Sequence, residues 1–234
     1  MRKVMTGVAV LLLSGSAIAA DTPPFSGETN ASWLKSTGSS EKETIKGLVA
    51  GKYLHNRWTH ELKLEALNES DGSTGQRTSE RYLAQEKSSW NFTERDFLFY
   101  KMQVEKDQQS SWDYQAFAAL GYGHIFIKTD TMYLSTELGA GTRHSKDDLT
   151  GNTTDEALGN AALKYEWKFR PGARFNEDIA LEVGEDNTVL RTRTALTFDL
   201  TQVINLSMAY ETKRDDGPSN IDDTMTSVGL GYRF

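Results

Sequence analysis

Apolar and polar residues alternate with a period of two along most of the chain. Leu163 and Trp167, for example, fall on one side of a segment that carries Lys164 and Lys168 on the other. Successive side chains of a strand point to opposite faces, so this pattern predicts strands with one apolar and one polar face. Twelve segments follow it, at about residues 25–36, 43–54, 57–68, 79–92, 95–106, 112–126, 129–144, 158–169, 172–184, 188–200, 203–213 and 223–234. The segment at 79–92 fits least well, because Glu86 falls on its apolar side.

The lengths of these segments and of their connections favour a membrane barrel. Most segments have about ten to thirteen residues, which exceeds a typical soluble strand and suits a tilted crossing of a bilayer. Short connections at 55–56, 93–94, 128, 170–171 and 201–202 alternate with mostly longer ones at 37–42, 69–78, 107–111, 145–157, 185–187 and 214–222. An outer-membrane barrel with both termini in the periplasm has long outer connections and short periplasmic turns in this order. The predicted fold is an all-β, antiparallel up-and-down transmembrane β-barrel of about twelve strands.

Prolines and aromatic residues fit this assignment. All four prolines, at positions 23, 24, 171 and 218, lie in the lead-in or in predicted connections, as residues without a ladder donor should. A girdle at the membrane interface would explain the aromatic residues near the short turns and the C-terminus, which are Tyr53, Trp58, Trp90, Phe92, Phe126, Trp167, Phe169, Phe198 and Tyr232. A second set lies toward the other rim, namely Trp33, Tyr82, Trp112, Tyr114 and Tyr210. A soluble β-sandwich with these rings in its core stays open as an alternative.

The first residues predict export. Arg2 and Lys3 precede an apolar stretch of about ten residues and small residues before Asp21, which is typical of a secretory signal peptide and too short for a membrane anchor. We expect a signal peptide at 1–19, cleaved near Ala19, a short lead-in at 20–24 and an outer-membrane barrel at 25–234. No later segment approaches the roughly eighteen apolar residues of a spanning helix, so helical insertion is excluded.

The last strand carries Val228, Leu230, Tyr232 and Phe234 at alternate positions. This ending resembles the signal that the barrel-assembly machinery reads in bacterial outer-membrane proteins. Together with the segments at 25–27, 79–82, 113–115 and 165–168, the stretch 224–234 also resembles the YdiY-like family of outer-membrane proteins, described as salt-induced and known as domain-of-unknown-function family 481. The resemblance covers nearly all of the mature chain. It implies an outer-membrane barrel and offers no catalytic residues to transfer.

Charge and composition exclude two classes. The formal charge is −7, and −9 without Arg2 and Lys3, which is unfavourable for binding nucleic acid. The chain has no cysteine, so it is not a disulfide-stapled scaffold.

Motifs for catalysis or metal binding are weak. A lipase-type barrel needs a serine and a histidine two residues apart on one strand face, and no serine stands two positions after any of the four histidines, His55, His60, His124 and His144. His144 with Asp147 and Asp148 could form a protease site at the rim, but such charged runs are usually solvated loops. Carboxylates beside one outer loop could hold calcium or magnesium loosely, without the spacing of a calcium loop, at Asp215, Asp216, Asp222 and Asp223. We expect no enzyme, no cofactor and no metal site.

The polar faces should line the lumen. Strand parity places nine bases there, Lys63, Lys101, Arg143, Lys164, Lys168, Arg191, Arg193, Lys213 and Arg233, and eight acids, Glu61, Glu65, Glu105, Asp113, Glu137, Glu166, Glu182 and Glu211. Because buried unpaired charges are costly, this near-balance predicts ion pairs across strands. The main lumenal candidates are Lys63, Lys101, Lys164, Glu166, Lys168, Arg191 and Arg193.

Two functions remain open at this point. One is a narrow passive pore, with small acidic solutes drawn by Arg191, Arg193 and Lys164. The other is a structural or envelope-stress barrel that conducts nothing, and an outer-membrane enzyme ranks third. The expected partners are outer-membrane lipid, lipopolysaccharide and the barrel-assembly machinery, which binds through the last strand.

Overall fold

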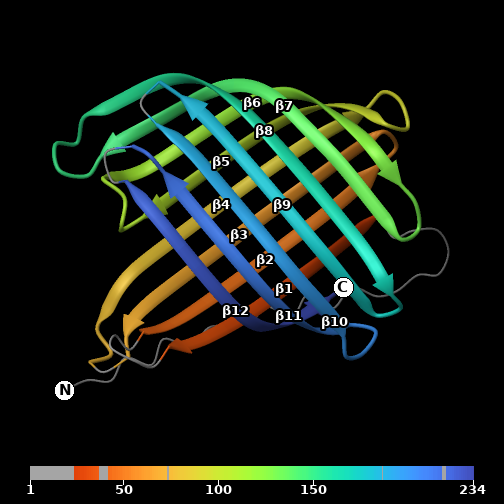
Figure 1. The fold of residues 1–234 in the computed structure, drawn as a ribbon. Coiled ribbons are helices and arrows are strands. Elements are labelled where there is room, and N and C mark those ends of the chain that lie inside the picture. The colour runs from red at the N-terminus through yellow and green to blue at the C-terminus, as the bar shows by residue number, and fades with distance from the viewer. Residues whose placement is uncertain (1–23, 37–41, 73, 186, 218–219) are drawn as a thin grey trace.

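The computed structural model describes residues 24–36, 42–72, 74–185, 187–217 and 220–234. Within them, twelve strands form one sheet that closes on itself (Figure 1). The strands are β1 (Phe25–Ser36), β2 (Lys42–His55), β3 (Trp58–Asp71), β4 (Arg77–Asn91), β5 (Asp96–Asp107), β6 (Trp112–Lys128), β7 (Met132–Asp147), β8 (Thr153–Arg170), β9 (Ala173–Gly184), β10 (Thr188–Asp199), β11 (Ile204–Asp215) and β12 (Ile221–Arg233). Each strand pairs antiparallel with the next, and β1 pairs with β12. The predicted all-β barrel is confirmed.

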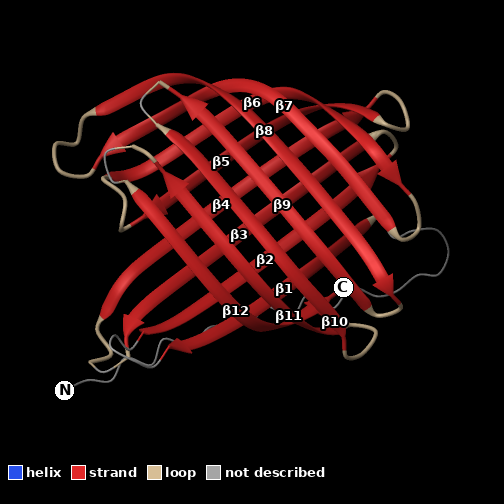
Figure 2. Ribbon diagram, in the orientation of Figure 1, coloured by secondary structure: helices blue, strands red, loops and turns tan. Residues whose placement is uncertain are grey.

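The described part of the chain consists of strands and short connections, without a helix (Figure 2). None of its segments is therefore a helix that could span a membrane. The strands in front, β9 to β11, slope against those behind, β3 to β5 (Figure 1). Such a tilt is required when a twisted sheet closes into a barrel.

The predicted connections were too long on one side of the barrel. The connection predicted at 145–157 narrows to 148–152, because β7 and β8 keep pairing as far as Lys146 and Thr153. The connections also do not alternate strictly in length, because three residues separate β9 from β10 and four separate β10 from β11, although the turns at 56–57 and 171–172 are very short. Hairpins that continue as strands satisfy their backbone groups in the ladder instead of in a loop.

The barrel is apolar outside and charged inside. Large apolar side chains on the outer face are exposed, including Leu120 at 66% and Leu138 at 65%. Inside the barrel, Arg143 and Glu182 are only 2% and 3% exposed. Soluble proteins show the reverse, with apolar residues inside and charged residues outside. An outer belt of this kind matches hydrocarbon and not water.

Part of the inner wall is nevertheless apolar. Phe97 and Phe99 of β5 point inward and pack with Ile125 of β6. Their rings lie against Gly123 and Gly121, where an added Cβ would come within 2.1 Å and 2.4 Å of ring atoms. The two glycines therefore provide the space for these rings, and this sector of the wall is filled by side chains.

Candidate functional site

The lumen contains a cavity of about 740 Å³. Its lining extends from Ser26 and Arg233, near the short turns, to Lys213 and Asp223, near the opposite end of the strands. Thirteen lysines and arginines and ten aspartates and glutamates line it, so the cavity wall is net positive in an acidic chain. The alternation of β-strands explains why charged side chains collect there, since every second residue of each strand faces the lumen.

All seven main lumenal candidates of the sequence analysis line this cavity: Lys63, Lys101, Lys164, Glu166, Lys168, Arg191 and Arg193. Asp113 does not, and its predicted lumenal position is wrong. A β-bulge between Trp112 and Tyr114 breaks the parity of β6 there. The carboxylate of Asp113 instead accepts hydrogen bonds from Lys106 at 2.8 Å and Lys146 at 3.0 Å.

Further cationic residues of the cavity were absent from the sequence-based set, namely Lys46, Lys52, Arg81, Lys87 and Arg174. The signal that could have found them is strand parity. Lys46 and Lys52 alternate with Ile45, Val49 and Tyr53, which are exposed on the outer face of β2. In β4 the same rule was obscured, because the outer face carries Glu86.

A group of ion pairs, here called the cross-lumen cluster, joins opposite walls of the barrel. It consists of Glu105, Asp107, Arg191, Lys213, Glu182 and Arg143. Lys213 of β11 donates to Glu105 at 2.5 Å and to Asp107 at 2.8 Å, both on β5. Five strands lie between β5 and β11 on either side of the ring of twelve, so these bonds cross the lumen.

Arginines extend the cross-lumen cluster. Arg191 of β10 lies 2.7 Å from Glu105 and 3.3 Å from Glu182. Glu182 is also 3.1 Å from Arg143, whose guanidinium donates to Asn187 as well. The side chains of the cluster are nearly all buried, so the cluster fills this level of the lumen with paired charges.

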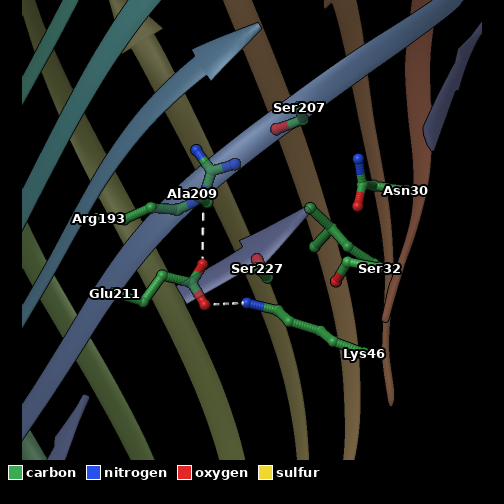
Figure 3. A pocket seen from close by; sticks show the side chains of 9 residues that line it. Asn30, Ser32, Lys46, Arg193, Ser207, Ala209, Glu211 and Ser227 are labelled. Atoms are coloured by element: carbon green, nitrogen blue, oxygen red, sulfur yellow. Dashed lines mark hydrogen bonds and ion pairs between the residues drawn. The ribbon is translucent and has the colours of Figure 1, made fainter. Parts of the chain in front are cut away.

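A second network lies beside it (Figure 3). Glu211 of β11 binds Lys46 of β2 at 2.5 Å and Arg193 of β10 at 3.2 Å. Lys46 also lies 3.3 Å from Glu65. The same three charged residues and Ser32, Ser207 and Ser227 line a small polar pocket of about 20 Å³, which has room for one water molecule.

Ion pairing in the cavity leaves an imbalance. Nine of the ten carboxylates that line it lie within 4 Å of a lysine or arginine, and Asp223 is the exception among the described residues. On the cationic side, Lys52, Lys101 and Lys164 have no carboxylate within that distance in the described part of the chain. Lys101 instead lies over the ring of Phe117, 5.2 Å from its centroid. The unpaired charge of the cavity is therefore mainly positive.

The outer face of β3 and β4 holds a polar group that sequence spacing did not reveal. His60 and Ser88 are directly paired across the strands, with Nδ1 and Oγ 2.7 Å apart, and Ser88 donates to Glu86 Oε1 at 2.5 Å. In a catalytic triad the acid binds the imidazole and not the serine. These contacts therefore do not reproduce the order of a triad.

Three of the four aspartates considered for metal binding have other partners, and the fourth, Asp223, lines the cavity. Asp222 pairs with Arg214 at 3.3 Å, Asp215 accepts from Asn187 at 2.7 Å, and Asp216 accepts from the backbone of Thr188. Among the described residues, no group of three or more histidines, aspartates or glutamates is arranged to hold a metal ion.

Solved structures of outer-membrane channels share this architecture. The chain is similar to the NanC porin, with a TM-score of 0.57 and 10% identity over 88% of this chain and 98% of the porin. It is also similar to an outer-membrane channel from Pseudomonas putida F1, with a TM-score of 0.52 and 12% identity over 92% of this chain and 96% of that one. The fold is that of an outer-membrane β-barrel.

The family is shown by sequence. The model described as "Protein of unknown function, DUF481" matches residues 29–234, and the chain belongs to this family. It is 26% identical over 214 residues to the Escherichia coli (strain K12) protein described as "Uncharacterized protein YdiY", covering 89% of this chain and 83% of that protein. The resemblance to YdiY-like proteins is confirmed.

Proposed function

We propose that the chain is an integral outer-membrane protein whose lumen is a narrow passive pore for small solutes. The observation that supports this most is the cavity of about 740 Å³, whose polar lining extends along the strands inside an apolar outer belt. Hydrophilic solutes need such a lumen to cross a bilayer. Twelve strands fall between the filled interior of eight-stranded barrels and the aqueous channel of sixteen-stranded ones, which suits a narrow passage.

The charge of the cavity favours small acidic solutes. Of the three cations expected to attract them, Arg191 and Arg193 are already paired with carboxylates. Lys164 has no such partner in the described part of the chain. The attraction therefore falls to Lys164 and the other unpaired lysines and not to the arginines.

The rest of the proposal follows from the outer surface and the sequence. Outer-membrane lipid and lipopolysaccharide cover the apolar belt, and the barrel-assembly machinery recognises β12 through Val228, Leu230, Tyr232 and Phe234. These four side chains lie on the outer face of the strand or at its end, partly exposed.

Residues 1–19, which lie outside the described residues, act as the export signal. The proposal includes no catalysis and no cofactor, and it links expression to salt or envelope stress, which a transcript measurement at raised salt would test.

A second function is favoured by the cross-lumen cluster. Because Lys213 and Arg191 reach the opposite wall at Glu105, the cluster obstructs one level of the lumen. A barrel closed in this way would serve as a structural or envelope-stress protein that conducts nothing.

Conductance in planar bilayers distinguishes the two functions. The mature chain is refolded in detergent, and its folded state is checked on gels. A closed strand ladder should resist unfolding by the detergent until the sample is boiled, so boiled and unboiled samples should migrate differently. A narrow anion-preferring pore should give small, reproducible conductance steps. In a salt gradient, its reversal potential should have the sign expected for anion selectivity. Folded protein that gives no steps would contradict the pore and support the closed barrel.

A further inference from the structure

The unpaired lysines occupy regular positions around the lumen. Lys52 stands on β2, Lys101 on β5 and Lys164 on β8. Each is three strands from the next in the ring of twelve, which is a quarter of the circumference. Lys52 and Lys164 therefore project from opposite walls, and Lys101 projects from the wall between them.

The charges of two of these lysines, Lys52 and Lys164, act on a common space. The ammonium groups of Lys52 and Lys164 interact electrostatically with each other, and both interact with Glu61. Glu61 is also paired with Lys87 at 3.1 Å, so its single negative charge is shared among three ammonium groups. Like charges that face each other without partners are unfavourable, and an anion placed between them removes the repulsion.

Neutral hydrogen-bonding groups complete the wall. The cavity lining includes amides and hydroxyls at Gln85, Gln103, Ser135, Asn176 and Thr197. Together with short aliphatic side chains such as Ala50, Ala162 and Ala180, they can accommodate a small polar organic molecule. The cavity volume lies in the range of small-molecule sites.

We propose that Lys52, Lys101 and Lys164 form a binding site for small organic anions with two or more negative groups, such as di- and tricarboxylates. Two ammonium groups on opposite walls can each bind one carboxylate of such a molecule, whereas a monocarboxylate reaches only one of them. The inference names the solute class of the proposed pore and rests on that function for its physiological meaning, but the site itself exists whether or not the barrel conducts.

Isothermal titration calorimetry of the folded barrel in detergent tests the site directly, with citrate, succinate and acetate as probes at neutral pH and low ionic strength. We expect citrate to bind at least tenfold more tightly than acetate. The variant K52Q/K164Q should weaken citrate binding at least tenfold. K106Q, which removes a lysine of the outer face, should bind citrate as the natural chain does.

Equal affinity for citrate and acetate, or undiminished citrate binding in K52Q/K164Q, would overturn the site. If the double variant does not fold, K101Q provides the second test, with a severalfold loss expected and an unchanged affinity counting against the site. Failure of the pore is recognised separately. Citrate binding without bilayer conductance would support the site and contradict the pore. Conductance without citrate binding would support the pore and contradict the site.

Discussion

Lys213 connects two carboxylates of the opposite wall, and its side chain is only 6% exposed. Burial of charge is unfavourable unless each group has partners, and here Glu105 has two cations and Asp107 one. A cross-lumen ion pair of this kind fixes the distance between two walls that no backbone hydrogen bond connects. The lumenal charges therefore contribute to the shape of the barrel as well as to its selectivity.

Replacing Lys213 with methionine should destabilise the barrel. The substitution leaves Asp107 buried without its cation, which typically costs about 3–5 kcal/mol. Unfolding in denaturant, followed by tryptophan fluorescence of the barrel in lipid vesicles, measures the loss. Adding Asp107→Asn to Lys213→Met should restore part of the stability, because the uncompensated charge is then removed.

The control is Lys106→Met, which removes a lysine that pairs with Asp113 outside the cavity. It should leave the unfolding midpoint unchanged, since exposed ion pairs contribute little. If Lys213→Met proved as mild as this control, Lys213 would be solvated in the lumen and the cross-lumen cluster would not hold the walls together.

Each strand separates lipid from lumen, and β8 shows how far the sequence can predict which side chains face each of them. Its parity follows directly from the alternation, because lipid and lumen select different side chains. Parity failed where the ladder is irregular, since the bulge at Trp112 and Tyr114 turns Asp113 outward without any proline or glycine to mark it. Strand parity places Phe97 and Phe99 on the same face of β5 as Lys101, but the fit of their rings against Gly121 and Gly123 depends on a contact between strands.

The two faces of β8 can be tested at adjacent residues. Arginine at Leu163, four residues from Trp167 of the aromatic girdle, should cost about 2–4 kcal/mol, because it places a charge in hydrocarbon. Glutamine at Lys164 should leave folding nearly intact, since a lumenal polar group stays hydrated, and should shift the ion preference toward cations. Folding yield and reversal potential report the two effects separately. Damage to folding from Lys164→Gln alone would mean that the two faces of β8 are exchanged.

At the scale of the whole barrel, the number of strands and their order could be predicted from the sequence, since each strand is a local pattern. The ion pairs between β5 and β11 could not, because they depend on how the closed sheet brings distant strands face to face. Barrel closure itself rests on a short seam, where β1 and β12 share six residue pairs, against twelve for β1 and β2. Phe234 extends the seam with two backbone hydrogen bonds to Gly27.

The orientation of the barrel can be tested with epitope tags, because opposite ends of the strands should face opposite compartments. In an outer-membrane barrel with periplasmic termini, the connection 148–152 faces outward and the turn 171–172 faces the periplasm. A tag after Asp148 should be tolerated and should bind antibody on intact cells, since the neighbouring Leu149 is 93% exposed and lies beyond the strand ladder. A tag between Pro171 and Gly172 should bind antibody only after the outer membrane is permeabilised. Labelling of the second tag on intact cells, with the first accessible only from the periplasm, would show that the barrel is inserted in the opposite direction, and the cross-lumen cluster would then lie toward the periplasm.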